Sequence, residues 1–310
     1  MTATTIEIPP KAATATLKFG SRDVRLTNLS KVFFPDAGYT KRDLLTYYAA
    51  MADVLVPHLK DRAMVMKRYP NGIDGKFFFA KRTPAGAPEW LKKCHIEHGS
   101  GSIIDFPMTQ DAATLLWLIN LGCIDLNPWY SRCDDINRPD YLNFDLDPVA
   151  PATWDSVCET ALLVREALEK IGAPTFAKTS GSRGIHIYIP IQRGPLQKKV
   201  WSYAKALARE LEKKNPALVT AEYRIAKRPP GRILVDYNQN AWGRTLASVY
   251  SVRPRPAASV STPLEWAEIE QRIPLEEFTM ATIPARVAEK GDLWKKLLSP
   301  RGRFDLQPHL

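Results

Sequence analysis

Two aspartates, Asp145 and Asp147, lie one residue apart at the end of an apolar stretch and are the side chains best suited to chemistry. The segment from Tyr141 to Asp147 has the composition of a strand, and Pro148 cannot extend a hydrogen-bonded ladder. Side chains alternate along a strand, so the two carboxylates are predicted to share one face. Like charges this close repel unless a cation lies between them, and hard oxygen ligands favour Mg²⁺ or Mn²⁺ over zinc. The pair predicts a metal site; a solvated strand end is the alternative.

A second group of residues suits phosphate binding. Residues 180–184 read Ser-Gly-Ser-Arg-Gly between two expected strands, so Ser180 and backbone N–H groups could cradle a phosphate, with charge from Arg183. His186 follows inside the next strand, where a core histidine is the alternative. Asp236 ends another apolar strand and adds a third carboxylate. Three carboxylates at strand ends beside a phosphate loop are typical of two-metal phosphoryl transfer.

Basic residues elsewhere in the chain indicate further anion sites. Arg253 and Arg255 alternate in Val-Arg-Pro-Arg-Pro, which predicts that they share a strand face suited to a triphosphate. Lys31 and Lys41 flank the start of a helix expected from 41 to about 55, where Thr40 and Asp43 predict a capping box. A helix start with nearby lysines suits a phosphate, although two solvated lysines are the alternative.

Aromatic residues flanked by bases occur in the stretch Gly-Lys-Phe-Phe-Phe-Ala-Lys-Arg, residues 75–82. Phe78 and Phe79 could stack on unpaired bases while the flanking cations meet phosphates. The alternative is a strand whose phenylalanines face the core, and at least one of the three is expected to do so.

The composition favours a polyanionic partner. Lys and Arg number 43 and Asp and Glu 33 in the 310 residues, which gives a net charge of +10. No apolar run approaches the length of a membrane span, and the Ala/Thr/Pro-rich start lacks the core of a signal peptide. Four irregularly spaced cysteines favour a reduced setting. We therefore expect a cytoplasmic, nucleoid-associated protein with no membrane partner.

In combination, four motifs resemble the polymerase domain of bacterial and archaeal DNA ligase D, within the archaeo-eukaryotic primase superfamily. They are Asp145-Leu-Asp-Pro, Ser180-Gly-Ser-Arg-Gly-Ile-His, Asp236-Tyr-Asn-Gln-Asn and Tyr250-Ser-Val-Arg-Pro-Arg-Pro. The resemblance covers about residues 18–300, which leaves 1–17 as a loosely ordered segment and 301–310 as a polar C-terminal tail. It implies an α/β (α+β) primase-polymerase fold, with two interleaved α/β modules around a mixed catalytic sheet.

The resemblance also implies roles for these residues. Two ions, Mn²⁺ or Mg²⁺, are expected on Asp145, Asp147 and Asp236, and the nucleotide phosphates on Ser180, His186, Arg253 and Arg255. Lys31 and Lys41 match a pocket for a DNA 5′-phosphate, and Phe78 and Phe79 match residues that stack on the template.

The implied activity is template-directed nucleotidyl transfer from NTP or dNTP, with ribonucleotides preferred, at gaps, breaks and 5′-phosphate ends in non-homologous end joining. Expected partners are a Ku-type protein and an ATP-dependent DNA ligase. One departure is Asn127, where family members often carry a histidine before Pro-Trp. A metal-dependent nuclease or phosphatase, and a non-catalytic module that bridges DNA ends, stay open as alternatives.

Overall fold

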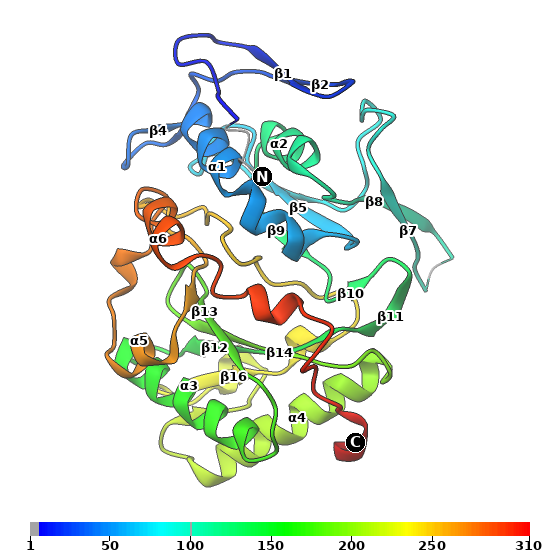
Figure 1. The fold of residues 1–310 in the computed structure, drawn as a ribbon. Helices are drawn as coiled ribbons and strands as arrows, with labels where there is room; N and C mark the ends of the chain where they lie inside the picture. Colours follow the sequence, from blue (N-terminus) through cyan, green and yellow to red (C-terminus); the bar gives the residue numbers. More distant parts are fainter. Residues whose placement is uncertain (1–5, 100) are drawn as a thin grey trace. The chain divides into compact units, whose positions relative to one another are not determined.

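Each of two folded units draws on three separate segments of the chain (Figure 1). The computed structural model describes residues 6–99 and 101–310. Unit 1 comprises Met1–Trp129, Ala247–Val260 and Phe278–Gly291, and unit 2 comprises Tyr130–Leu246, Ser261–Glu277 and Asp292–Leu310. This interleaving agrees with the two modules expected from the sequence.

Unit 1 is built from helices α1 and α2, which pack on each other, the short helix α6, a three-stranded sheet in the order β6-β5-β9, and hairpins β1-β2, β3-β4 and β7-β8. Its elements are β1 (Ala15–Phe19), β2 (Arg22–Leu26), β3 (Val32–Phe34), β4 (Tyr39–Thr40), α1 (Lys41–Leu59), β5 (Met64–Arg68), β6 (Phe78–Ala80), β7 (Lys93–Glu97), β8 (Ile103–Pro107), α2 (Ala112–Asn120), β9 (Cys123–Pro128) and α6 (Ile283–Lys290). The capping box of Thr40 and Asp43 is present at the start of α1, as predicted.

Unit 2 contains a six-stranded sheet in the order β15-β16-β12-β14-β13-β17. Only the β15–β16 pair is parallel among its strand pairs, so the sheet is mixed. The elements of the unit are β10 (Ser131–Arg132), β11 (Asp135–Pro139), β12 (Tyr141–Pro148), α3 (Trp154–Glu169), β13 (Phe176–Thr179), β14 (Ile185–Pro190), α4 (Gln197–Lys214), β15 (Val219–Thr220), β16 (Ile233–Asp236), β17 (Pro263–Leu264) and α5 (Trp266–Glu270), with 3₁₀ turns η1 (Ile225–Lys227), η2 (Asn238–Asn240), η3 (Leu275–Glu277), η4 (Lys295–Leu298) and η5 (Gln307–His309).

Helices α3 and α4 pack against β12 of this sheet (Figure 1). They bury apolar residues at helical spacing, such as Val157, Ala161 and Val164 in α3. The central strands β12 and β14 are buried along nearly their whole length, so a polar side chain on them needs a partner.

The expectation of reduced cysteines changes in the structure, because two of the four are disulfide-bonded. The C-terminal tail is docked on unit 2, because the N–H of Phe304 donates to the Pro190 oxygen at 2.8 Å and both Phe304 and Leu306 are buried. Cys94 and Cys133 are disulfide-bonded, whereas Cys123 and Cys158 are free and buried. Within the described residues, no helix has the length and apolar composition needed to cross a membrane.

Candidate active site

The acidic centre of unit 2 lies on three neighbouring strands. Asp145 in β12 is paired in the ladder with His186 of β14 on one side and with Asp236 of β16 on the other. Directly paired residues point to the same face of a sheet, so the three side chains form a row. Nε2 of His186 lies 3.2 Å from Oδ1 of Asp145, and all three residues are buried.

Asp147 lies two residues beyond Asp145 on the same face, and its side chain reaches the surface. The charge of Asp145, together with burial and the charge of Asp236, raises the pKa of Asp147 to about 7, although Arg228 and Arg183 oppose the shift. Burial, with a contribution from Asp145, also raises the pKa of Asp236. The carboxylates therefore repel one another, which is the condition that a divalent cation relieves.

The donor set fits a hard divalent cation through its chemistry, because the nearby groups are carboxylate oxygens. Across residues 6–99 and 101–310, no three or more Asp, Glu, His or Cys side chains are already arranged around a metal position. The fit rests on the cross-strand pairing of the acids and on the raised pKa values of Asp147 and Asp236.

Two residues after β16 fix the orientation of Asp236. The N–H of Asn238 donates to Oδ1 at 2.8 Å, and Nε2 of Gln239 donates to Oδ2 at 3.1 Å. Asn240 holds strand β12 through two hydrogen bonds to the backbone of Asn143: its Oδ1 accepts the N–H, and its Nδ2 donates to the carbonyl oxygen. The motif that follows Asp236 thus orients this acid and anchors β12 at Asn143, a function that sequence reasoning had not assigned to it.

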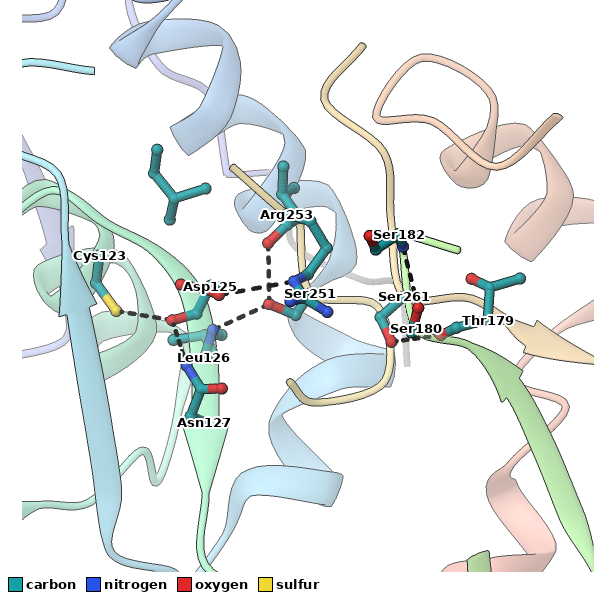
Figure 2. Close-up of polar contacts among 12 residues, drawn as sticks. Cys123, Asp125, Leu126, Asn127, Thr179, Ser180, Ser182, Ser251, Arg253 and Ser261 are labelled. Atoms are coloured by element: carbon teal, nitrogen blue, oxygen red, sulfur yellow. Dashed lines mark hydrogen bonds and ion pairs between the residues drawn. The ribbon is translucent and has the colours of Figure 1, made fainter. Parts of the chain in front are cut away.

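The Ser180 loop is held by its own backbone and pressed against β12. Oγ of Ser180 accepts hydrogen bonds from the N–H groups of Ser182 and Gly184, each at 3.1 Å (Figure 2 shows the first). A Cβ on Gly184 would lie 2.1 Å from the Leu146 oxygen, so only glycine permits this approach. The loop therefore lies beside the segment between the two aspartates, and Arg183 is exposed on it.

Arg253 belongs to unit 1, where a buried acid is paired with it. Its Nε lies 3.6 Å from Oδ2 of Asp125 in β9, and Oγ of Ser251 accepts the N–H of Leu126 at 2.9 Å (Figure 2). The expectation that Arg253 and Arg255 share a strand face was wrong. The N–H of Arg255 instead donates to the Arg253 oxygen at 2.8 Å in a tight turn, because prolines 254 and 256 have no N–H for a ladder.

Lys67 joins this basic group in unit 1 and was not identified from the sequence. It is the cross-strand partner of Asp125. Burial lowers the pKa of Lys67, and the charges of Arg253 and Arg255 add to the effect while Asp125 opposes it. Three cations and one buried acid form a site with surplus positive charge, which suits a polyphosphate.

The phenylalanines of the aromatic stretch are all exposed, contrary to the expectation that at least one faces the core. Phe78 and Phe79 are paired in β6 with Arg68 and Lys67 of β5. The guanidinium of Arg68 lies 5.2 Å from the Phe78 ring centroid, and the ammonium of Lys67 lies 5.8 Å from that of Phe79. Exposed rings next to cations are the arrangement that base stacking requires.

Lys31 and Lys41 line a cavity of about 260 Å³ together with Asn28 and Arg68. Nζ of Lys31 donates to the Pro70 oxygen at 2.7 Å, and Nζ of Lys41 donates to the Thr27 oxygen at 2.7 Å. Burial and the charges of Lys31 and Arg68 lower the pKa of Lys41 to about 8. The cavity therefore gathers cations at the start of α1 and suits a bound anion. Arg68 is an addition that sequence spacing could not reveal.

Known proteins provide a direct comparison. A family model described as "LigD, primase-polymerase domain" matches residues 40–294. The chain belongs to this family. The expected fold class and the expected enzyme class, a DNA-directed nucleotidyltransferase, are thereby confirmed.

Relatives of this family include the multifunctional non-homologous end joining DNA repair protein LigD of Mycobacterium tuberculosis, which is 34% identical over 88% of the chain. The bifunctional LigD of Bacillus subtilis is 29% identical over 86% of the chain. The chain spans only 37% and 43% of these two proteins, respectively.

Among solved structures, the chain is similar to the polymerase domain of Mycobacterium tuberculosis ligase D in complex with DNA. The TM-score is 0.84 at 32% identity, covering 89% of this chain and 98% of that domain. The roles of individual site residues in this chain stay predictions.

Proposed function

We propose that this chain extends a primer strand on a DNA template at gaps and breaks during non-homologous end joining. The observation that carries the proposal is the row of His186, Asp145 and Asp236 across three strands, with Asp147 on the same face, in a chain of the LigD primase-polymerase family. We assign the primase-polymerase domain to about residues 18–300.

Asp145, Asp147 and Asp236 are the proposed ligands of two divalent cations, Mn²⁺ or Mg²⁺. When bound, the ions supply the charge that activates a primer 3′-OH and neutralises a triphosphate. Asn238 and Gln239 hold Asp236 in place for this role, and Gly184 brings the phosphate loop against β12. No protein side chain needs to act as a nucleophile.

The incoming nucleotide, an NTP preferred over a dNTP, is proposed to bind through its phosphates. Ser180, Arg183 and His186 are the proposed donors beside the acidic row. Arg253 and Arg255 are the proposed guanidinium groups, with Lys67 as a further cation. These groups suit β- and γ-phosphates, because charge-assisted bonds to phosphate are the strongest hydrogen bonds available to a protein.

DNA is proposed to bind at two features of unit 1. The cavity lined by Lys31, Lys41 and Arg68 would take a 5′-phosphate, and the exposed rings of Phe78 and Phe79 would stack on template bases. We propose a Ku-type protein and an ATP-dependent ligase as partners, and association with chromosomal DNA in the cytoplasm, as for an end-joining enzyme.

The test is primer extension on a 5′-phosphorylated gapped duplex with Mn²⁺ and either nucleotide type. Asp145→Ala should abolish extension and leave DNA binding largely intact, because the acid holds metal rather than DNA. Glu159→Ala, which removes an exposed acid of α3 in the same unit, is the control and should retain full activity. Extension by the Asp145 variant would refute the site assignment, and shortened primers with the wild type would indicate a nuclease.

A further inference from the structure

Lys178 is a fully buried lysine that the proposed reaction does not yet use. It lies in β13 at 0% exposure, and its ladder partner is His186. The row described above therefore continues across a fourth strand, as Lys178, His186, Asp145 and Asp236. A lysine is almost never fully buried without a partner that uses its charge.

The hydrogen bond at Nδ1 of the imidazole determines where its proton lies. Nζ of Lys178 is 2.6 Å from Nδ1 of His186, and Nε2 of the same ring is 3.2 Å from Oδ1 of Asp145. An ammonium group has donors only, so Nδ1 must accept. A neutral imidazole whose Nδ1 accepts carries its proton on Nε2, the nitrogen that lies on the side of Asp145.

The surroundings of Lys178 agree with a charged ammonium. Its Nζ lies 2.5 Å from Oγ of Ser261, and that hydroxyl donates to the Thr179 oxygen at 2.8 Å (Figure 2). The lone pairs of the hydroxyl therefore face Lys178, as a charged donor requires. Lys178 therefore donates both to the Ser261 hydroxyl and to Nδ1 of His186.

We infer that Lys178 is a positioning residue that fixes His186 as the neutral tautomer with its proton on Nε2. This rests on the proposed function in one respect, namely that His186 donates to a nucleotide phosphate. A ring held in this way presents an N–H, whereas the other tautomer presents a lone pair, which a phosphate oxygen repels. Lys178 thus keeps the donor in place when a phosphate or a metal ion draws Asp145 away.

The test reads the ring nitrogens directly, by long-range ¹H–¹⁵N spectra of the ¹⁵N-labelled, metal-free protein. His186→Gln assigns the signals through their loss. We expect Nε2 protonated and Nδ1 unprotonated in the wild type. Lys178→Met, which keeps the length and removes the donor, should shift the Nδ1 signal, because the hydrogen bond from Nζ is lost. His58, which is also buried, serves as an internal control whose signals should not move.

Two further variants separate the partners of the ring. Asp145→Ala should leave Nδ1 unprotonated, because Lys178 alone sets the tautomer. Ser261→Ala should do the same. A proton on Nδ1 in the wild type, or its appearance in Asp145→Ala, overturns the inference, as does an unchanged spectrum of Lys178→Met. The wild-type and Asp145→Ala spectra decide the matter even where Lys178→Met fails to fold.

A kinetic measurement tests the link to the reaction. Lys178→Met should raise the KM for the nucleotide about tenfold with a smaller change in kcat, the loss expected for one hydrogen bond to a charged group. An unchanged KM would overturn this link. Absence of polymerase activity in the wild type would overturn the proposed function instead, while the spectra would still report the tautomer.

Discussion

Gly184→Ala is a one-carbon change that tests how the phosphate loop is held against β12. The added Cβ would lie 2.1 Å from the Leu146 oxygen, 3.2 Å from the Leu146 carbonyl carbon and 3.7 Å from Oδ1 of Asp147. The first atom is main-chain oxygen in a central strand, so it cannot rotate away as a side chain could. The loop itself must retreat.

The size of the effect follows from that distance. A Cβ needs about 3.0 Å of separation, so the loop would move by about 1 Å from the acidic strand. Overpacking of this kind costs about 1–3 kcal/mol of unfolding free energy. A displacement of about 1 Å in a group that positions substrate costs about 100-fold in rate. We therefore expect kcat/KM for nucleotide addition to fall about 100-fold.

The assay is steady-state primer extension, run at a temperature where urea denaturation shows both proteins to be folded. Gly194→Ala is the matched control in unit 2, because a Cβ there meets nothing within 4 Å. It should change stability by no more than about 0.5 kcal/mol and leave activity intact. A Gly184→Ala enzyme with normal stability and normal rate would refute the reasoning, since the close approach would then serve no purpose.

Three other perturbations address separate features. The folded-state pKa of Asp147, about 7, lies above its usual value of 3.8. The metal-free protein should therefore become less stable to urea as the pH rises from about 4 to about 7. Over the same range, Mn²⁺ binding measured by calorimetry should become tighter and release protons. Lys41→Gln should reduce the preference for 5′-phosphorylated over 5′-hydroxyl gaps, and it should lower the slope of log binding constant against log salt concentration by about 1. Lys60→Gln, at the other end of α1, is the control and should change neither quantity. Equal preference in both variants would contradict the cavity assignment. Tyr48→Phe removes a hydroxyl that donates to the Ile124 oxygen at 2.6 Å and accepts the N–H of Val252 at 3.0 Å. It should lower the free energy of unfolding, measured with denaturant, by about 1–3 kcal/mol. A smaller loss would mean that water replaces these hydrogen bonds.

Local chemistry in the sequence predicted the local structure well. The Thr40–Asp43 capping box, the strand that carries Asp145 and Asp147, and the loop before His186 follow from short-range rules of spacing and turn formation. That strand runs one residue further than expected, because Pro148 is still paired with Ile233 of β16. The proline-rich stretch at residues 253–256 misled the prediction, because alternation suggested a strand where missing N–H groups allow only a turn.

Pairing between distant segments could not be predicted from one sequence. Asp145 and Asp236 are 91 positions apart, and only the register of β12 with β16 places them opposite each other. No sequence motif marks Lys67, Asp125 or Lys178 as site residues. Each is placed in the site by the residue paired with it on the neighbouring strand. The resemblance to a family identified several site residues through their motifs, but it did not identify the residues that hold them in place.

Interleaving has a consequence for how the protein is made. Unit 1 needs Phe278–Gly291 and unit 2 needs Asp292–Leu310, so the core of unit 1 is incomplete until Gly291 has been added and that of unit 2 until the residues up to 310 have been added. Long-range closure of this kind slows folding and leaves apolar surface exposed in the nascent chain. Expression of either unit alone, cut from the chain at a single point, should therefore yield aggregated material.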